Sequence, residues 1–283
     1  MDMTDRESAI TALTSHHFSQ EYRLEDHYRN VVNYDSEYLG PYIPFIGEHY
    51  FDTKPRLLIY AMSQNLAKIR DCIRTWNEKP DKGLLRQYYY PEKPNFSVGP
   101  YDNGNLKVIA AFVFSSYPST CYKPTDNIDD LVSITNFVKF SFYQEDKKGN
   151  YLDSAPPLDI YNIMWEKYCK YEVSILQPNV IIGVGNEVAN ALKRNLEAER
   201  EPEFKILKIP FPGRLNLNSR WIPKGKRLIK TENHNPDLDI INTKALLRGT
   251  SSKKGLPHMQ RIIKTDWYYF REMRAYINKE LTR

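Results

Sequence analysis

The 283-residue sequence has few cysteines and no long apolar run. Its three cysteines, Cys72, Cys121 and Cys169, are widely spaced and form no Cys-x-x-Cys pair. This pattern argues against a disulfide framework and against a zinc site, so we expect reduced thiols. The longest apolar stretches, 108–114 and 180–184, are far shorter than the roughly 20 residues needed to cross a bilayer. We therefore expect no membrane span.

The signatures of several enzyme classes are also missing. None of the six histidines has the i,i+4 spacing of a helical metal site, although His16 and His17 are adjacent. There is no Gly-x-Ser-x-Gly motif, so acyl hydrolysis has no support in the sequence. The first residues are acidic and are not followed by an apolar run, so we expect no secretory signal and a cytoplasmic location.

Charge is distributed unevenly along the chain. Residues 1–50 contain three Lys/Arg and nine Asp/Glu, a net charge of −6, whereas residues 205–283 contain eighteen and six, a net charge of +12. Cationic side chains gain binding free energy when they release counterions from a phosphate backbone, and aromatic rings between them can stack on bases. This combination is typical of nucleic-acid binding. The alternative is a solvated basic helix. We expect DNA as the partner, with Lys224, Lys226 and Arg227 among its contacts.

Strand and helix patterns alternate along the sequence. Buried-strand patterns occur at 55–60, 107–114, 131–140, 180–185 and 204–210, and helical spacing occurs at 63–70, 158–176, 187–198 and 265–281. This alternation predicts an α/β protein with a three-layer α/β/α fold and a mostly parallel sheet. In such folds ligands bind at the carboxyl ends of the strands. We expect a domain over 1–220, with its core at about 55–216, and a basic extension over 221–283.

Several motifs then occur in a characteristic order. Ile134-Thr-Asn-Phe-Val-Lys139 resembles the I-T-N-x-V-K strand end of the iron-sulfur type of uracil-DNA glycosylase. Further landmarks of that family are matched by Tyr60-Ala-Met-Ser-Gln-Asn65, Ala155-Pro-Pro157, Leu176-Gln-Pro-Asn-Val-Ile-Ile-Gly183 and Ile209-Pro-Phe-Pro-Gly-Arg214. The resemblance spans about residues 55–216 and implies the fold of the uracil-DNA glycosylase superfamily.

The resemblance implies roles for individual residues. A flipped base needs a pocket that stacks on its ring and hydrogen-bonds its edge. Asn136 would read that edge, because a side-chain amide offers a donor and an acceptor together; the alternative is an asparagine that only terminates a strand. Phe96, or else Tyr101, would stack on the base. The water would be positioned by Ser63, Gln64 or Asn65.

The sequence also departs from the family pattern. Phe211 stands in place of the histidine that would stabilise charge on the departing base, and Arg214 could substitute for it or clamp a phosphate. Phe140 stands in place of a cluster cysteine, and only Cys169 resembles another. A four-thiolate cluster cannot be assembled, so we expect no cofactor and no metal.

These features predict a DNA glycosylase that acts on a non-standard base. A bulky modified pyrimidine of the kind found in phage genomes is one candidate, and the Pro-, Asn- and Tyr-rich stretch 76–105 could line a wider pocket. The alternative is a catalytically silent DNA-binding module of the same fold. A third reading, nucleotide processing at the Gly183-Val-Gly185 turn, has weaker support because the third glycine of the dinucleotide motif is missing.

Overall fold

The structure is a computed structural model that describes residues 5–20, 31–32, 41–63, 104–117, 128–148, 151–198, 204–209 and 267–282. At its centre is a five-stranded sheet with the strand order β2-β4-β3-β7-β8. Four strands are parallel, namely β3 (Leu57–Ala61), β4 (Val132–Asn136), β7 (Val180–Val184) and β8 (Lys205–Ile209). The short β2 (Phe45–Ile46) pairs antiparallel with β4. The prediction of an α/β protein with a mostly parallel sheet is confirmed.

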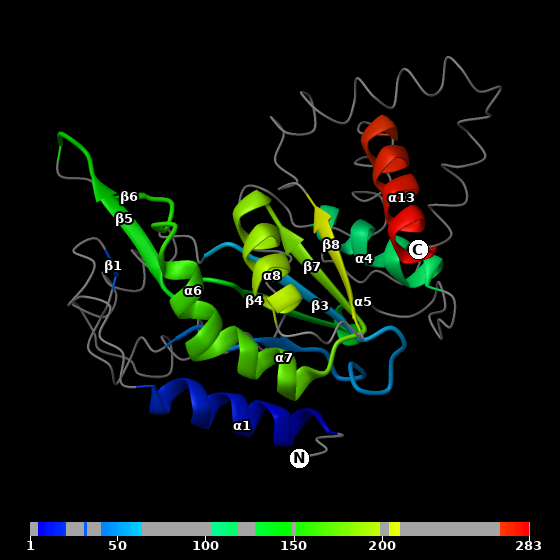
Figure 1. Cartoon of the computed structure of the whole chain (residues 1–283), viewed down its shortest axis with the longest axis horizontal. Helices are drawn as coiled ribbons and strands as arrows, with labels where there is room; N and C mark the ends of the chain where they lie inside the picture. Colours follow the sequence, from blue (N-terminus) through cyan, green and yellow to red (C-terminus); the bar gives the residue numbers. More distant parts are fainter. Residues whose placement is uncertain are drawn as a thin grey trace.

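Helices pack on both faces of this sheet (Figure 1). Leu57 and Ile59 of β3 enter one core cluster, and Leu58 and Tyr60 enter the other, as the alternation of a strand requires. The first cluster contains residues of α4 (Gly104–Ser116), α5 (Ile128–Leu131) and α13 (Trp267–Thr282). The second contains residues of α1 (Arg6–Ser19), α6 (Ile160–Met164), η3 (Trp165–Cys169), α7 (Lys170–Leu176) and α8 (Asn186–Ala198).

One predicted strand is a helix. The stretch 107–114 lies within α4, which runs from Gly104 to Ser116. Its residues 109–114 are all buried, because α4 packs in the core cluster that it shares with the sheet and α13. A helix that is apolar all round gives the same short apolar run as a strand buried on both faces, so the pattern did not distinguish them.

The other described helices agree with their predicted positions. The helix expected over 158–176 is a continuous run from Ile160 to Leu176, with a π-helical segment at Trp165–Cys169. The helices expected over 187–198 and 265–281 are α8 and α13, and α13 packs against α4 and β8. The helix expected over 63–70 lies outside the described residues beyond Ser63.

Sequence patterns missed two other parts of the fold. Helix α1 packs against α7 and the π-helical segment. A second, three-stranded sheet has the order β1-β5-β6, formed by β1 (Val31–Val32), β5 (Ser141–Glu145) and β6 (Tyr151–Asp153). No described helix is both long and apolar enough to span a membrane.

Candidate functional site

The main sheet changes winding direction between β3 and β7. After β3 the chain returns through α4, which belongs to the first core cluster, whereas β7 leads into α8, which belongs to the second. Strands β3 and β7 are neighbours, and α4 and α8, the described helices that follow them, pack on opposite faces of the sheet (Figure 1). Ligands of open α/β sheets bind outside the carboxyl ends of the strands at such a switch point. This edge is the candidate site.

Asn136 lies at this edge. It is the last residue of β4, sits opposite Ala61 of β3 and is 7% exposed. The pairing continues past the strand ends, because Phe137 N donates to Ala61 O at 2.8 Å and Val138 N donates to Met62 O at 2.9 Å. The segment from Ala61 to the half-buried Ser63 therefore lies beside the residues that follow Asn136. The structure brings these two predicted site residues to the same edge.

The remaining predicted site residues lie outside the described part of the chain. They are Gln64, Asn65, Phe96, Tyr101, Phe211, Arg214, Lys224, Lys226 and Arg227. Their roles in stacking, water positioning and DNA binding stay predictions.

The glycines at the carboxyl end of β7, Gly183 within the strand and Gly185 just after it, have structural roles. A Cβ on Gly183 would lie 2.7 Å from the Cα of Ala189, so the glycine lets α8 pack closely on the strand. Gly185 has φ of +96°, a backbone conformation that glycine adopts without strain. Close packing and a tight turn therefore account for the Gly-Val-Gly sequence without a bound nucleotide.

A carboxylate at this edge was missed by the sequence analysis. Glu187 is exposed in the first turn of α8, and its Oε2 atom lies 3.9 Å from the position of a Cβ on Gly185. Burial and the negative charge of Glu187 raise the pKa of Tyr161 to about 12. The buried Tyr161 hydroxyl has no hydrogen-bond partner among the described residues, and its ring packs 5.4 Å from that of Phe137. The sequence signal that could have identified Glu187 is an acidic residue directly after a buried strand and a turn.

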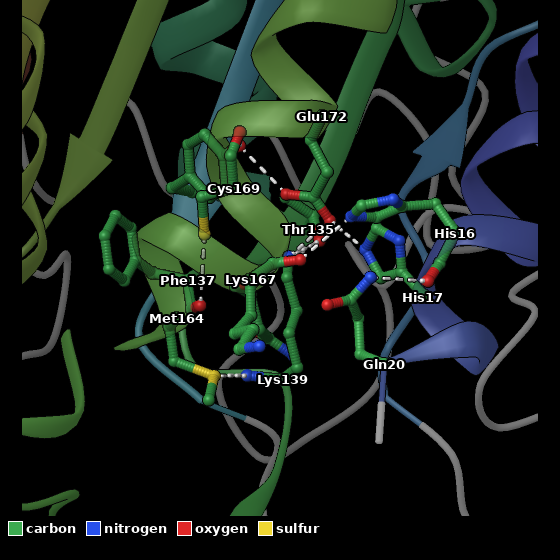
Figure 2. A network of polar contacts seen from close by, with 12 residues as sticks. His16, His17, Gln20, Thr135, Phe137, Lys139, Met164, Lys167, Cys169 and Glu172 are labelled. Atoms are coloured by element: carbon green, nitrogen blue, oxygen red, sulfur yellow. Dashed lines mark hydrogen bonds and ion pairs between the residues drawn. The ribbon is translucent and has the colours of Figure 1, made fainter. Parts of the chain in front are cut away.

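A buried polar cluster lies beside the end of β4. We define it as His17, Tyr60, Thr135, Lys139 and Glu172. Figure 2 labels all of these residues except Tyr60. Glu172 of α7 is its centre: Oε1 lies 2.6 Å from Lys139 Nζ and 2.8 Å from His17 Nε2, and Oε2 accepts a hydrogen bond from the Tyr60 hydroxyl at 2.9 Å. All five side chains are buried.

The cluster contains one full ion pair. Burial alone would raise the pKa of Glu172, but the Lys139 ammonium and the hydrogen bonds to the carboxylate hold this pKa below its ordinary value. Burial lowers the pKa of His17 despite the neighbouring carboxylate. At neutral pH the Glu172 carboxylate is therefore paired with Lys139, and a neutral His17 donates its Nε2 hydrogen. His17 Nδ1 has no hydrogen-bond partner among the described residues.

Lys139 links this cluster to Asn136. Its Nζ atom donates to Thr135 Oγ1 at 2.9 Å and to the backbone carbonyl of Asn136 at 2.5 Å. The backbone of Lys139 is fixed as well, because Tyr42 N donates to its carbonyl at 3.0 Å. The motif Ile134–Lys139 was recognised from the sequence, but the contact between its lysine and its asparagine was not.

The two residues considered for an iron-sulfur cluster are part of the core. Phe140 and Cys169 are buried, and the Cys169 thiol donates to the Phe137 carbonyl at 3.4 Å. Burial raises the pKa of this thiol, so it is protonated at neutral pH. Among the described residues, no group of His, Cys, Asp and Glu side chains could hold a metal ion.

A pocket of about 600 Å³ lies at the opposite edge of the sheet. Its lining includes Arg56 and Asn179, which precede β3 and β7, and Phe204, which precedes β8. It does not coincide with the switch point. The candidate site is therefore assigned from the strand connections and polar side chains.

Neither known protein-family models nor curated protein sequences gave a match to this chain.

Proposed function

We propose that the chain is a DNA glycosylase with a three-layer fold of the uracil-DNA glycosylase type. It flips a non-standard base out of DNA, receives it at the carboxyl edge of the sheet and hydrolyses its N-glycosidic bond. The observation that carries this proposal is the position of Asn136. It is the last residue of β4, and its backbone carbonyl accepts a hydrogen bond from the buried Lys139. An asparagine at this edge suits the recognition of a base by paired hydrogen bonds.

The arrangement of the sheet supports the proposal. Four parallel strands with helices on both faces agree with the layers that the resemblance implies. The ordered motifs also fall on corresponding elements: the segment 60–65 begins at the end of β3, 134–139 spans the end of β4, and 176–183 leads into β7. Two of these motifs meet at the candidate edge.

The reaction needs a positioned water and stabilisation of a cation-like sugar. Ser63 is uncharged but can hold a water in line, because glycosidic cleavage depends on positioning more than on proton removal. The carboxylate of Glu187 supplies negative charge at the same edge, where it can stabilise the developing positive charge or accept a proton from the water. Glu187 therefore provides a group that was absent from the sequence-based prediction.

Cations on the described surface suit a DNA partner. On α8 and β8, Arg194 donates to the amide oxygen of Asn162 at 2.8 Å, and Lys208 donates to that of Asn190 at 3.1 Å. These bonds position the cations without neutralising their charge. Together with the net charge of +12 over 205–283, they favour attraction of a phosphate backbone.

The second candidate function is a silent DNA-binding module of the same fold. It is favoured by the uncharged Ser63 at the water-orienting position and by Phe211 in place of a charge-stabilising histidine. This protein would bind DNA at the same edge without breaking a bond.

The test is an excision assay on DNA of varied base chemistry. Duplexes and single strands would carry uracil, hypoxanthine, hydroxymethylated cytosine or glucosylated cytosine, and abasic sites would be scored by alkali cleavage. Asn136→Ala should lower excision roughly tenfold to a hundredfold, with little change in DNA affinity, because base contacts specify and phosphate contacts bind. Asn195→Ala is the matched control, since the amide of Asn195 bonds Ala191 within α8.

The possible results separate the candidates. Undiminished excision by Asn136→Ala would show that Asn136 does not recognise the base. DNA binding without excision of any base by the native protein would favour the silent module.

A further inference from the structure

We propose that Lys139 is a positioning residue for Asn136, and that its buried ion pair with Glu172 fixes the strand end that presents the base-reading amide. The inference rests on the proposed function for the role of that amide. The hydrogen bond between Lys139 and the Asn136 carbonyl can be tested separately.

The hydrogen bonds of the Lys139 ammonium account for its full donor capacity. An ammonium has three N–H donors. Those of Lys139 are directed to Glu172 Oε1, Thr135 Oγ1 and the Asn136 carbonyl, at 2.6, 2.9 and 2.5 Å. Because all three N–H donors are engaged, the ammonium cannot turn away from Asn136 without losing a charge-assisted bond.

The acceptor is the peptide that joins Asn136 to Phe137. Its N–H belongs to Phe137 and donates to Ala61 O on the neighbouring strand. The peptide is thus held from both sides, by the lysine at its oxygen and by β3 at its nitrogen. The torsions that flank this peptide, ψ of Asn136 and φ of Phe137, are therefore restrained, which limits the directions that the Asn136 side chain can take.

Glu172 holds the lysine and is itself held by two distant elements. His17 of α1 and Tyr60 of β3 both donate to its carboxylate. The position of Lys139 therefore depends on α1, β3 and α7 being packed together. Figure 2 shows Glu172 directed toward His17 and Lys139 at this junction.

The stability of the fold does not by itself explain why Lys139 and Glu172 are charged residues in the core. Replacing a buried ion pair by apolar side chains of similar volume is often neutral or stabilising, because both charges had to leave water. What such a replacement would not supply here is a donor for the Asn136 carbonyl. The ion pair thus provides orientation that a well-packed apolar core would lack.

The experiment compares the native protein with Lys139→Met and with the double variant Lys139→Met/Glu172→Gln. The single variant leaves a buried carboxylate without its cation and should be destabilised. The double variant removes both charges at similar volume and should recover much of the lost stability in urea. A positioning role predicts that excision by the double variant remains roughly tenfold to a hundredfold low in kcat with unchanged DNA affinity. Recovery of activity along with stability would show a purely structural role and overturn the proposal.

A second measurement does not depend on any enzymatic activity. Labelling with [¹³C-carbonyl]Asn and [¹⁵N]Phe selects Asn-Phe peptides, which occur twice in the sequence, at Asn95-Phe96 and Asn136-Phe137. Asn136→Ala removes the second signal and so assigns it. In the double variant the Asn136 carbonyl signal should shift, because the ammonium hydrogen bond is lost.

The two measurements separate failure of the inference from failure of the proposed function. An unmoved Asn136 carbonyl signal in the folded double variant would overturn the Lys139 proposal whatever the excision assay shows. If the native protein excises no base, the proposed function fails, and a shifted carbonyl signal still establishes that Lys139 fixes this strand end.

Discussion

The Nζ atom of Lys139 lies 2.6 Å from Oε1 of Glu172, and neither side chain is exposed to solvent. The pair joins the end of a central strand to helix α7, and His17 brings helix α1 to the same carboxylate. A buried charge is tolerated when it is paired and becomes costly when its partner is removed. The stability of this region should therefore depend on charge balance as well as on packing.

Lys139→Met should destabilise the protein in a pH-dependent way. At pH 8 the loss should be about 3–5 kcal/mol, because the Glu172 carboxylate is left buried without a cation. The positive charge of Lys139 lowers the pKa of His17, so its removal should raise that pKa and let the imidazolium replace the lysine as the pH falls. The difference in the free energy of unfolding between variant and native protein should then shrink below about pH 6.5.

Urea unfolding at a series of pH values measures this difference. The double variant His17→Gln/Lys139→Met should be compared with His17→Gln alone. Its deficit in the free energy of unfolding should stay constant through this pH range, since neither protein has an imidazole at position 17 that can take up a proton. A constant deficit in Lys139→Met itself would contradict the coupling between His17 and Lys139.

The native protein should lose stability as the pH falls below about 6.5. Burial lowers the pKa of His17 from the ordinary value of 6.5, so the unfolded chain takes up this proton first and is favoured. The pKa of Glu172 is held below 4.5, and its contribution should be lost in turn as the pH falls through that lower range. His17→Gln should flatten the first part of the profile and keep the second, as measured by urea midpoints. An unchanged first part would place the responsible group elsewhere.

Local patterns predicted most of the central sheet because buried parallel strands have a distinctive composition. The apolar run 180–184 after a proline and asparagine is β7, and the regular spacing after it is α8. The run 107–114 had the same appearance and proved to be a helix, since burial on all sides removes the polar face that marks helical periodicity. Asn136 was identified through a motif, and the structure shows it as the last residue of β4.

The buried cluster could not be predicted from the sequence for a different reason. Lysine, glutamate and histidine are normally solvated, so each is interpreted locally as a surface residue. His17 and Glu172 are 155 positions apart, and only the packing of α1 against α7 brings them together. Glu187 was overlooked in the same way, as an ordinary first-turn acid, because its place beside the strand ends follows from the strand order.

Gly183→Ala should destabilise the protein by about 1–3 kcal/mol, as overpacking of a core does. The added Cβ would lie 2.7 Å from the Cα and 3.0 Å from the Cβ of Ala189, so α8 must move away from β7. Adding Ala189→Gly should recover only part of the loss, because the close backbone Cα remains. Thermal unfolding of the single and double variants tests this prediction, and a Gly183→Ala protein of native stability would show that the helix can move freely.

Glu187→Gln should reduce excision by roughly tenfold to a hundredfold if this carboxylate assists the water or stabilises the sugar cation. The uncharged amide keeps the size of the side chain but neither accepts the proton nor offsets the charge. Glu166→Gln, at an exposed position of the π-helical segment, is a matched control that changes the net charge equally. The kinetic constants and DNA affinity of each variant should be compared. Equal activity in the two variants would leave Ser63, Gln64 or Asn65 to position the water.

The salt dependence of DNA binding should reveal where the phosphates lie. Each phosphate contact contributes about −0.9 to the slope of log K against log salt concentration on duplex DNA. Replacing Lys224, Lys226 and Arg227 by alanine should therefore reduce the slope by up to about three such units if all three residues contact phosphates.

The matched control replaces Lys54, Lys147 and Lys148, which are exposed and change the net charge by the same amount. Equal flattening in both triple variants would indicate a bulk charge effect, because the distribution of charge would then be irrelevant. An unchanged slope in the first variant would shift attention to Arg194 and Lys208, whose cations are positioned by neighbouring amides. Flattening confined to the first variant would place the DNA on the basic carboxyl-terminal segment, since only released counterions change this slope.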